Sequence, residues 1–354
     1  MFKEVPEILV IGLISDEDLE RIGKIDKRLK VVDGRGLFDS EIKETWPHWS
    51  VQAFLENCQD RPSTRQKRHQ ILSKAEIILG GYPFPLTVRS RAPRLRWYHQ
   101  LQAGASNLRQ SDLWGSDVLV TTSRGYGNTR AIAEYVLAGF LHFARGLHQA
   151  NREQRRQHFD RSNYHPVLVQ GKTVGVIGAG GIGQEVARLC AGAGMRVIGT
   201  RRHKPPGNAL PAGFDRLSGS DGLLDVLAES HFVAICCQWT PETTKLIGRE
   251  AFAVMRTGTV LVNVARGEII DEKALLNALA AGKMRGVTLD VYVGEFEHEP
   301  DRRLWDDERV LITPHISSGT DKSQHRGVEL FCENLQAYLD GRPLSNVVDW
   351  ERGY

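Results

Sequence analysis

The second half of the chain shows a regular alternation of short apolar runs and segments with helical periodicity. Continuous apolar runs predict strands at 173–177, 195–199, 232–236, 260–263, 286–290 and 310–313. Amphipathic segments between them predict helices at 181–193, 222–229 and 272–281. Strands that are apolar on both faces and alternate with helices are typical of a parallel sheet covered on both sides.

The first part of the chain is less regular. Short apolar runs predict strands at 8–14, 76–79, 95–98 and 118–122, whereas the polar, basic stretch 60–70 predicts a solvated surface loop. Apolar positions at helical spacing predict one long helix from residue 129 to about 157, whose second half is strongly polar. A last helix is expected over 322–340.

A glycine-rich turn follows directly on the first strand of the regular half and opens the next helix. Gly178 permits a tight turn, Gly180 lets a pyrophosphate approach the backbone, and Gly183 lets the helix pack closely on the strand. The helix N-terminus adds N–H donors and a positive dipole end. Glycines also fill ordinary turns, but in this strand–turn–helix setting the motif predicts dinucleotide binding by Gly178, Gly180, Gly181, Ile182 and Gly183.

The tip of the second strand indicates which dinucleotide binds. An NAD-preferring site has Asp or Glu there to hold the ribose 2′-hydroxyl, but the chain reads Thr200-Arg201-Arg202-His203-Lys204. Arg201 and Arg202 can pair with a 2′-phosphate, which an acid would repel. The pattern favours NADP(H), with NAD(H) possible, and the alternative interpretation is a solvated basic loop.

Three polar residues follow later strands, at the sheet edge where proteins of this class bind ligands. Arg266 follows LVNVA, Glu295 lies beyond the strand that ends at Asp290, and His315 follows RVLITP. Taken alone, each of them could be structural, although loops at strand ends often carry function.

Several linked motifs, in the same order, resemble those of the D-isomer-specific 2-hydroxyacid dehydrogenases. They are GKTVGVIGAGGIGQEVARL (171–189), TPETTKLI (240–247), VLVNVARGEIIDEKALLNAL (260–279), GVTLDVY (286–292) and ITPHIS (312–317). Weaker matches at 95–108 and 131–145 extend the resemblance through most of the chain. It implies an α/β fold of two Rossmann-like domains with parallel sheets. The dinucleotide-binding domain, 126–324, would be inserted into the substrate (catalytic) domain, 1–125 and 325–354, with the active site in the cleft between them.

The resemblance implies catalytic roles for the three strand-end residues. Arg266 would bind the carboxylate and carbonyl oxygen of a 2-oxo acid, because its planar guanidinium can hold two oxygens. His315 would be the general acid–base, and Glu295 would hold its other ring nitrogen. The family usually reads Glu-Pro-Leu-Pro at this turn, but here Glu295 is followed by Phe296 and Glu297, which makes Glu297 a competing acid.

The family pattern also implies the substrate and cofactor contacts. Ala103 and Gly104 match a turn whose N–H groups receive the substrate carboxylate, with Arg266 and His315 completing the substrate site. The remaining cofactor-binding positions, beside the glycine turn and the two arginines, are Thr200, Cys237, Val264, Ala265, Asp290, Ser317 and Ser318.

The leading prediction is an oxidoreductase that transfers a hydride between NADP(H) and a small 2-oxo acid or its D-2-hydroxy acid. Glyoxylate and hydroxypyruvate are the substrates that the resemblance suggests. The alternatives are a dinucleotide-sensing, corepressor-like regulator and a formate- or phosphite-type dehydrogenase of the same fold. The long helix over 129–157 resembles the family's dimer-forming segment and predicts a homodimer, against a monomer with a solvated helix end.

Composition excludes some classes of protein. With 46 Lys and Arg against 43 Asp and Glu, the net charge of +3 is too small for a nucleic-acid-binding footprint over the whole surface. No apolar stretch has the length of a membrane helix, and the first residues do not resemble a signal peptide. The 5 cysteines form no CxxC pair, which predicts no metal site, no disulfide framework and a cytoplasmic protein.

Overall fold

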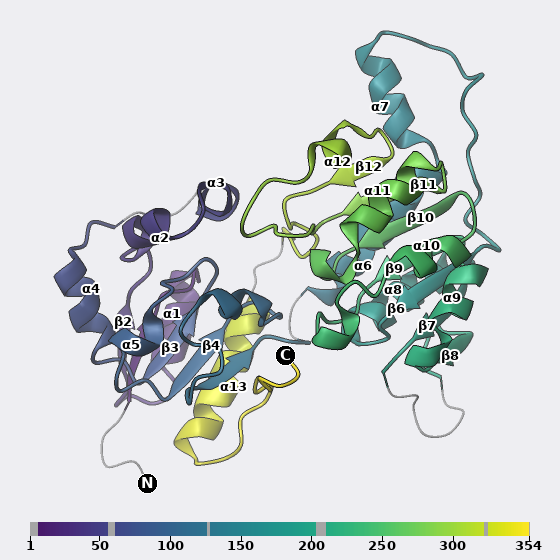
Figure 1. The fold of residues 1–354 in the computed structure, drawn as a ribbon. Coiled ribbons are helices and arrows are strands. Elements are labelled where there is room, and N and C mark those ends of the chain that lie inside the picture. Colours follow the sequence, from purple (N-terminus) through teal and green to yellow (C-terminus); the bar gives the residue numbers. More distant parts are fainter. Residues whose placement is uncertain (1–5, 56–60, 126–127, 203–209, 322–324, 354) are drawn as a thin grey trace. The chain divides into compact units, whose positions relative to one another are not determined.

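The chain folds into two α/β units, which a computed structural model describes over residues 6–55, 61–125, 128–202, 210–321 and 325–353 (Figure 1). Unit 1 comprises Met1–Gly127, Phe296–His298 and Asp321–Tyr354, and unit 2 comprises Asn128–Glu295 and Glu299–Thr320. The predicted boundaries fall at 125/126 and 324/325, and residues 126 and 324 lie outside the described residues. The assignment of a substrate domain and a dinucleotide-binding domain to these ranges stays a prediction.

Unit 1 is built on a parallel sheet with the strand order β2-β1-β3-β4-β5. Successive side chains of a strand face opposite sides of a sheet. Ile8 and Val10 accordingly belong to one hydrophobic cluster and Leu9 to another, so the sheet is apolar on both faces. The strands are β1 (Glu7–Val10), β2 (Lys30–Asp33), β3 (Ile77–Gly80), β4 (Trp97–Gln100) and β5 (Leu119–Thr122).

Helices cover both faces of this sheet. α1 (Asp16–Gly23) and α13 (His325–Leu339) pack on the face of Ile8 and Val10, through Ile22 of α1 and Phe331 of α13. The last helix, yellow in Figure 1, thus lies against strands from the first third of the chain. The opposite face is covered by α2 (Asp39–Thr45), α3 (His48–Leu55), α4 (Arg65–Leu72) and α5 (Val88–Arg91).

Unit 2 is built on a parallel sheet with the strand order β12-β11-β10-β9-β6-β7-β8. The order reverses between β9 and β6, and sheets of this kind bind ligands at such a point. The predicted α/β fold with two parallel sheets is confirmed. The strands are β6 (Thr173–Ile177), β7 (Arg196–Thr200), β8 (Arg216–Ser218), β9 (Phe232–Ile235), β10 (Thr259–Asn263), β11 (Met284–Leu289) and β12 (Val310–Ile312).

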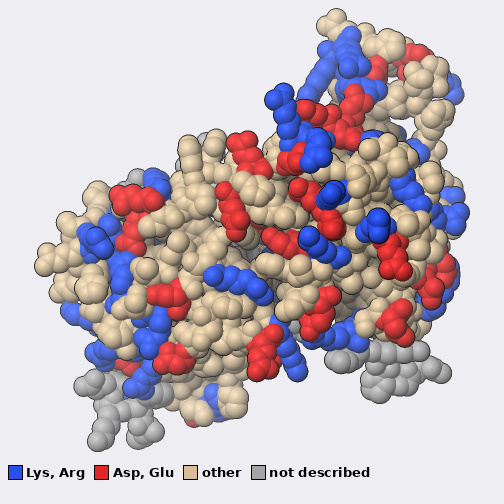
Figure 2. All heavy atoms as spheres, in the orientation of Figure 1, with Lys and Arg blue, Asp and Glu red and all other residues tan. Residues whose placement is uncertain are grey.

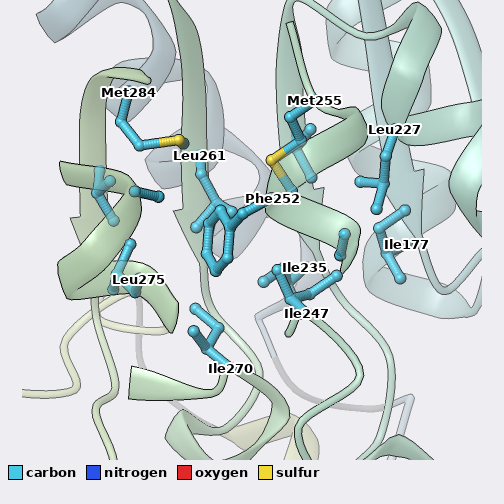
Figure 3. Close-up of a cluster of buried hydrophobic side chains, with 14 of the residues drawn as sticks. Ile177, Leu227, Ile235, Ile247, Phe252, Met255, Leu261, Ile270, Leu275 and Met284 are labelled. Atoms are coloured by element: carbon cyan, nitrogen blue, oxygen red, sulfur yellow. The ribbon is translucent and has the colours of Figure 1, made fainter. Parts of the chain in front are cut away.

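Two layers of helices enclose the sheet of unit 2. α6 (Thr129–Ala144) and α8 (Gly181–Gly192) cover one face. Figure 3 shows the core on the other face, where Leu261 of β10, Phe252 of α10 and Leu275 of α11 point toward one another. The helices of this second face are α9 (Leu223–Glu229), α10 (Arg249–Val254), α11 (Glu272–Ala280) and α12 (Arg302–Asp306). The 3-10 turns lie at Ser220–Gly222, Pro241–Thr243 and Gly267–Ile269 in unit 2 and at Ser106–Gln110 in unit 1.

The basic stretch predicted as a loop is instead partly helical, because residues 65–72 form α4. Thr64 caps this helix by accepting a hydrogen bond from the backbone N–H of Lys67. Arg68 is buried, with its Nε 3.0 Å from Glu41 Oε2. The prediction of a solvated loop is therefore wrong over residues 65–72, where Arg68 is buried in unit 1 and paired with Glu41.

The single long helix predicted over 129–157 is wrong as well. α6 ends at Ala144, and a separate helix, α7 (Leu147–Arg155), follows it. Gly146 between them has a φ of 72°, the left-handed conformation that ends α-helices. The residues after the break keep a helical but strongly polar sequence, so the expected helix was extended across Gly146.

Charged side chains of both signs are interspersed over the face drawn in Figure 2. Among the described residues, no helix is long and apolar enough to cross a membrane, and no group of His, Cys, Asp and Glu could hold a metal ion. Arg266, Glu295 and His315, the polar residues that the sequence singled out, lie in the loops that follow β10, β11 and β12.

A buried polar cluster lies beside β4 and β5 in unit 1. Thr121 Oγ1 is 2.8 Å from Trp97 Nε1 and 2.7 Å from His99 Nδ1, and Ser123 Oγ is 3.2 Å from His99 Nε2. His99 is fully buried, and burial lowers its pKa to about 3. The imidazole is therefore neutral in the folded protein at neutral pH.

We expect His99 to make the folded protein sensitive to acid. The pKa of an unfolded histidine is about 6.5, so below that pH the unfolded chain takes up a proton that the folded chain does not. The free energy of unfolding should fall between about pH 6.5 and pH 3, by up to about 1.4 kcal/mol per pH unit from this one group. Chemical denaturation of the wild type and His99→Asn over this range measures the contribution.

The variant should be less stable than the wild type at neutral pH but should lose less stability on acidification. His69→Asn, which removes an exposed histidine from α4, is the matched control and should keep the wild-type slope. Equal slopes for His99→Asn and the wild type would contradict the prediction.

Candidate active site

The glycine turn between β6 and α8 is so tight that two of its positions accept only glycine. Gly178 has a φ of 102°, and a Cβ there would lie 2.5 Å from the Cα of Cys237, just beyond the neighbouring strand β9. A Cβ on Gly183 would lie 2.1 Å from the carbonyl oxygen of Gly178. The helix therefore begins in direct contact with the end of β6, where the strand order reverses.

Gly180 and Gly181, in contrast, are exposed. Apart from the adjoining residues, no atom of the described chain lies within 4 Å of a Cβ built on Gly180. Both glycines stand at the N-terminus of α8, where the first N–H groups of a helix lack intrahelical acceptors and the dipole favours an anion. A pyrophosphate fits such bare backbone, so these residues suit the predicted dinucleotide.

The end of β7 is fixed against this turn by the backbone of Thr200. Its carbonyl oxygen accepts hydrogen bonds from the N–H groups of Gly178 (3.1 Å) and Ala179 (2.9 Å). Thr200 itself is buried. The residues that follow Thr200 consequently start beside the glycine turn.

The predicted phosphate-binding arginines lie at this tip. Arg201 and Arg202 are both exposed. The Arg202 guanidinium is 3.2 Å from Glu242 Oε2, in an exposed ion pair. His203 and Lys204, the rest of the basic cluster, lie outside the described residues.

The loop after β10 carries Arg266 and is shaped by a buried asparagine. The Asn263 amide donates to the carbonyl oxygen of Arg266 (2.9 Å), and its Oδ1 accepts from the N–H of Ala265 (3.0 Å). Val264 and Ala265 are buried, whereas Arg266 is partly exposed. The loop thus leaves the sheet with a fixed shape and holds Arg266 at the carboxyl end of β10.

The loop after β11 approaches the Arg266 loop too closely for a side chain. A Cβ on Gly267 would lie 1.9 Å from the carbonyl carbon of Tyr292. The Glu268 carboxylate accepts a hydrogen bond from the N–H of Gly294 at 3.4 Å. These contacts fasten the two loops together.

The next two loops bring the side chains of His315 and Glu295 into contact. His315 Nδ1 is 3.2 Å from Glu295 Oε1, and Glu295 is buried, whereas the competing Glu297 is exposed. Burial raises the pKa of the Glu268 carboxyl. Glu295 raises this pKa further and Arg266 lowers it, so Glu268 lies close to both residues. The structure therefore gathers Arg266, Glu268, Glu295 and His315 at one edge of the sheet.

Asp290, directly after β11, holds the loop that carries His315. Its Oδ1 accepts from Thr313 Oγ1 (2.7 Å) and from the N–H of Ile316 (2.8 Å), and its Oδ2 accepts from the N–H of Ser317 (2.9 Å). His315 has a φ of 53°, which non-glycine residues rarely adopt. The predicted cofactor roles of Asp290 and Ser317 stay predictions, whereas their part in shaping this loop is visible.

The predicted substrate turn of unit 1 follows β4. Gln100 Nε2 donates to the carbonyl oxygen of Gly104 and to Asn107 Oδ1 (2.9 Å), and the Asn107 amide donates back to Gln100 Oε1 (3.1 Å). Ala103 is exposed and Gly104 half-buried. The buried amide pair fixes the turn, and carboxylate binding by Ala103 and Gly104 stays a prediction.

Some residues around His315 were missed by the sequence reasoning. The Tyr135 hydroxyl lies 2.5 Å from Thr313 Oγ1, and Asn128 donates to the carbonyl oxygen of Ser318 at 2.8 Å. These partners are 178 and 190 residues apart in the chain, so no local pattern reveals them. Glu268 gave a signal, as an acid in the loop directly after β10.

Comparisons with known proteins agree with one another. Residues 137–317 match the model of the NAD-binding domain of the D-isomer specific 2-hydroxyacid dehydrogenases. A glyoxylate reductase from Thermococcus kodakarensis is 31% identical over 92% of this chain and 97% of that protein. A D-3-phosphoglycerate dehydrogenase from Methanocaldococcus jannaschii is 30% identical over 81% of this chain, but the chain spans about half (54%) of that protein.

A solved structure is similar along the whole chain. It is a D-isomer specific 2-hydroxyacid dehydrogenase from Xanthobacter autotrophicus Py2 in complex with NADPH and MES. The TM-score is 0.74 at 26% identity, and the match covers 99% of this chain and 100% of the other. The same architecture of two parallel-sheet units therefore occurs in that protein.

Alanine substitutions at Gly183 and Gly180 should differ in their effect on stability. Gly183→Ala forces a Cβ against a backbone carbonyl oxygen that cannot move aside, and we expect a loss of about 1–3 kcal/mol. Gly180→Ala meets open space at a φ of −85°, so its free energy of unfolding should stay within about 0.5 kcal/mol of the wild type. Chemical denaturation measures both, and equal losses would refute the packing role of Gly183.

Proposed function

The chain belongs to the D-isomer-specific 2-hydroxyacid dehydrogenase family, and from this membership we propose that it transfers a hydride between NADP(H) and a small 2-oxo acid or its D-2-hydroxy acid. The similarity to a glyoxylate reductase over nearly the full length of both chains supports a small substrate such as glyoxylate or hydroxypyruvate. The phosphoglycerate dehydrogenases support it less, because the chain spans about half their length.

The observation that carries the proposal is the contact of His315 Nδ1 with the buried carboxylate of Glu295, at 3.2 Å. A carboxylate on one ring nitrogen orients the imidazole, fixes its tautomer and stabilises the imidazolium. Nε2 is then the nitrogen that exchanges a proton with the substrate. His315 gives this proton to the carbonyl oxygen during reduction and removes it from the hydroxyl during oxidation.

Arg266 is proposed to hold the substrate against this histidine. Its guanidinium presents N–H donors in one plane, which suits the carboxylate and the carbonyl oxygen of a 2-oxo acid at once. Glu268 lies near Arg266, so the positive charge that attracts the substrate is partly balanced before the substrate binds. Ala103 and Gly104 are proposed to receive the carboxylate with their N–H groups.

We assign the dinucleotide to the strand-end loops of unit 2. When bound, its nicotinamide supplies or accepts the hydride. The exposed N-terminus of α8 offers N–H groups to a pyrophosphate, and Arg201 and Arg202 offer guanidinium groups to a 2′-phosphate. The other residues proposed to line the cofactor are Gly178, Ile182, Gly183, Thr200, Cys237, Val264, Ala265, Asp290, Ser317 and Ser318.

We further propose that the protein is a homodimer that associates through α6, α7 and the segment after α7. Leu147, Phe159 and Leu168 lie on α7 and this segment and are exposed to solvent. A second copy of the chain would cover these apolar side chains. A cytoplasmic location stays a prediction from the cysteine usage.

Substitution of His315 should abolish most of the activity. We expect His315→Ala to lower kcat by about 10²- to 10⁴-fold, the usual share of acid–base catalysis. Reduction of a panel of small 2-oxo acids, glyoxylate and hydroxypyruvate among them, with NADPH and with NADH measures this. Glu295→Gln should also lose activity, and Glu297→Gln, which alters the exposed acid nearby in the chain, is the control that should keep it.

Unchanged turnover in His315→Ala would remove His315 from the mechanism. Failure of the wild-type protein to reduce any 2-oxo acid would instead favour a dinucleotide-sensing regulator.

The cofactor preference should depend on the arginines at the tip of β7. The wild type should show a higher kcat/KM with NADPH than with NADH, and Arg201→Ala/Arg202→Ala should lower the NADPH value by about 10- to 100-fold, as expected for charge-assisted hydrogen bonds. The NADH value should change little. Arg188→Ala, on the exposed side of α8, is the matched control, and a wild-type preference for NADH would overturn the assignment.

A further inference from the structure

We propose that Tyr135 of α6 is a positioning residue for His315 and acts on it through Thr313 and Asp290. The inference rests on the proposed function, because it takes His315 as the acid–base group. Tyr135 itself touches neither the histidine nor the proposed substrate contacts in any described hydrogen bond. Its effect has to pass through the loop of residues 313–318.

The hydrogen bonds of this chain have a defined direction. A carboxylate oxygen only accepts, so the single hydroxyl proton of Thr313 is donated to Asp290 Oδ1, at 2.7 Å. Thr313 Oγ1 can then only accept from its other neighbour, the Tyr135 hydroxyl at 2.5 Å. Tyr135 therefore donates to Thr313, and Thr313 donates to Asp290.

Asp290 passes this constraint to the backbone around His315. The same Oδ1 also accepts from the N–H of Ile316 (2.8 Å), and Oδ2 accepts from the N–H of Ser317 (2.9 Å). The carbonyl oxygen of Asp290 accepts from the N–H of His315 at 3.1 Å. Asp290 thus holds His315 in its left-handed conformation from both sides. The hydrogen bond from Thr313, which Tyr135 orients, fixes the rotamer of Asp290.

Helix α6 is itself a rigid support for this contact. One turn after Tyr135, Gly139 packs so closely on the sheet that a Cβ there would lie 3.0 Å from Thr288 Oγ1 and from Val262 Cγ2. At the start of the same helix, Asn128 donates to the carbonyl oxygen of Ser318 (2.8 Å). The helix therefore holds the His315 loop at both ends, through Tyr135 at Thr313 and through Asn128 at Ser318.

Burial raises the pKa of the Tyr135 hydroxyl well above its ordinary value. The hydroxyl consequently keeps its proton and stays a donor to Thr313 at neutral pH.

Tyr135→Phe removes this one hydroxyl and leaves the ring, so it tests the proposal with little change in packing. Two measurements are made on the full chain: kcat and KM for the 2-oxo acid and for the cofactor, and hydrogen–deuterium exchange of peptides that cover residues 313–318. Loss of one buried hydrogen bond corresponds to a change of about 2- to 10-fold in a population or rate. We expect kcat to fall and exchange at Ile316 and Ser317 to rise by that factor, with both KM values nearly unchanged.

Variants of Thr313 provide the rescue and the stronger perturbation. Thr313→Ser keeps the hydroxyl between Tyr135 and Asp290 and should retain nearly wild-type kcat and exchange. Thr313→Val keeps the shape without the hydroxyl and should lose more than Tyr135→Phe. Tyr338→Phe, which removes a half-buried tyrosine hydroxyl from α13 in unit 1, is the matched control and should change neither measurement.

Wild-type kcat and wild-type exchange in Tyr135→Phe would overturn the proposal, even if the variant were less stable. A wild-type protein that reduces no 2-oxo acid would refute the proposed function instead. In that case the exchange of residues 313–318 would still decide whether Tyr135 positions the loop.

Discussion

The candidate active site depends on one buried carboxylate, that of Asp290. The loop after β12 has to bring His315 to Glu295, and it does so with His315 in a left-handed backbone conformation that is unfavourable on its own. Asp290 offsets this by accepting from Thr313 and from the N–H groups of two successive residues beyond the histidine. Hydrogen bonds to a carboxylate are the strong kind. An asparagine could not replace it, because its NH2 group would face one of these donors.

A second constraint is the absence of Cβ atoms where the strand-end loops meet. Gly183 lets α8 begin against the turn at Gly178, Gly178 lies against the backbone of Cys237, and Gly267 lies against the backbone of Tyr292. The last two contacts bring together loops from neighbouring strands that carry the predicted cofactor or catalytic residues. The glycine content of the chain, 35 of 354 residues, therefore has a structural use at this edge of the sheet, beyond ordinary turns.

Local patterns predicted most strands of the parallel sheets because strand burial leaves a signal within a few residues, and they missed the half-exposed edge strands β2 and β8. The strand predicted at 173–177 is β6 without any shift, and the helix predicted at 272–281 is α11, which is one residue shorter. The patterns failed where contacts between residues distant in the sequence determine the structure. Arg68, expected in a solvated loop, is instead buried in unit 1, where it pairs with Glu41. In the site, motif spacing located Arg266 and His315 and favoured Glu295 over the competing Glu297, but no pattern could show that Tyr135 contacts a residue 178 positions away.

The position of Arg201 and Arg202 at the tip of β7, and not the net charge, is what indicates a function for these arginines. Arg202 already has an acidic partner, Glu242, but the pair is exposed, with 41% and 67% of the two side chains in solvent, and exposed ion pairs contribute little stability. A 2′-phosphate carries nearly two negative charges and three acceptor oxygens, so it competes well with a single carboxylate for the guanidinium. The 2′-hydroxyl of NAD carries no charge and would leave Arg202 with Glu242. In the proposed NADP(H) site, Arg202 would therefore exchange a weak ion pair for a 2′-phosphate, an arrangement that the net charge of +3 alone does not reveal.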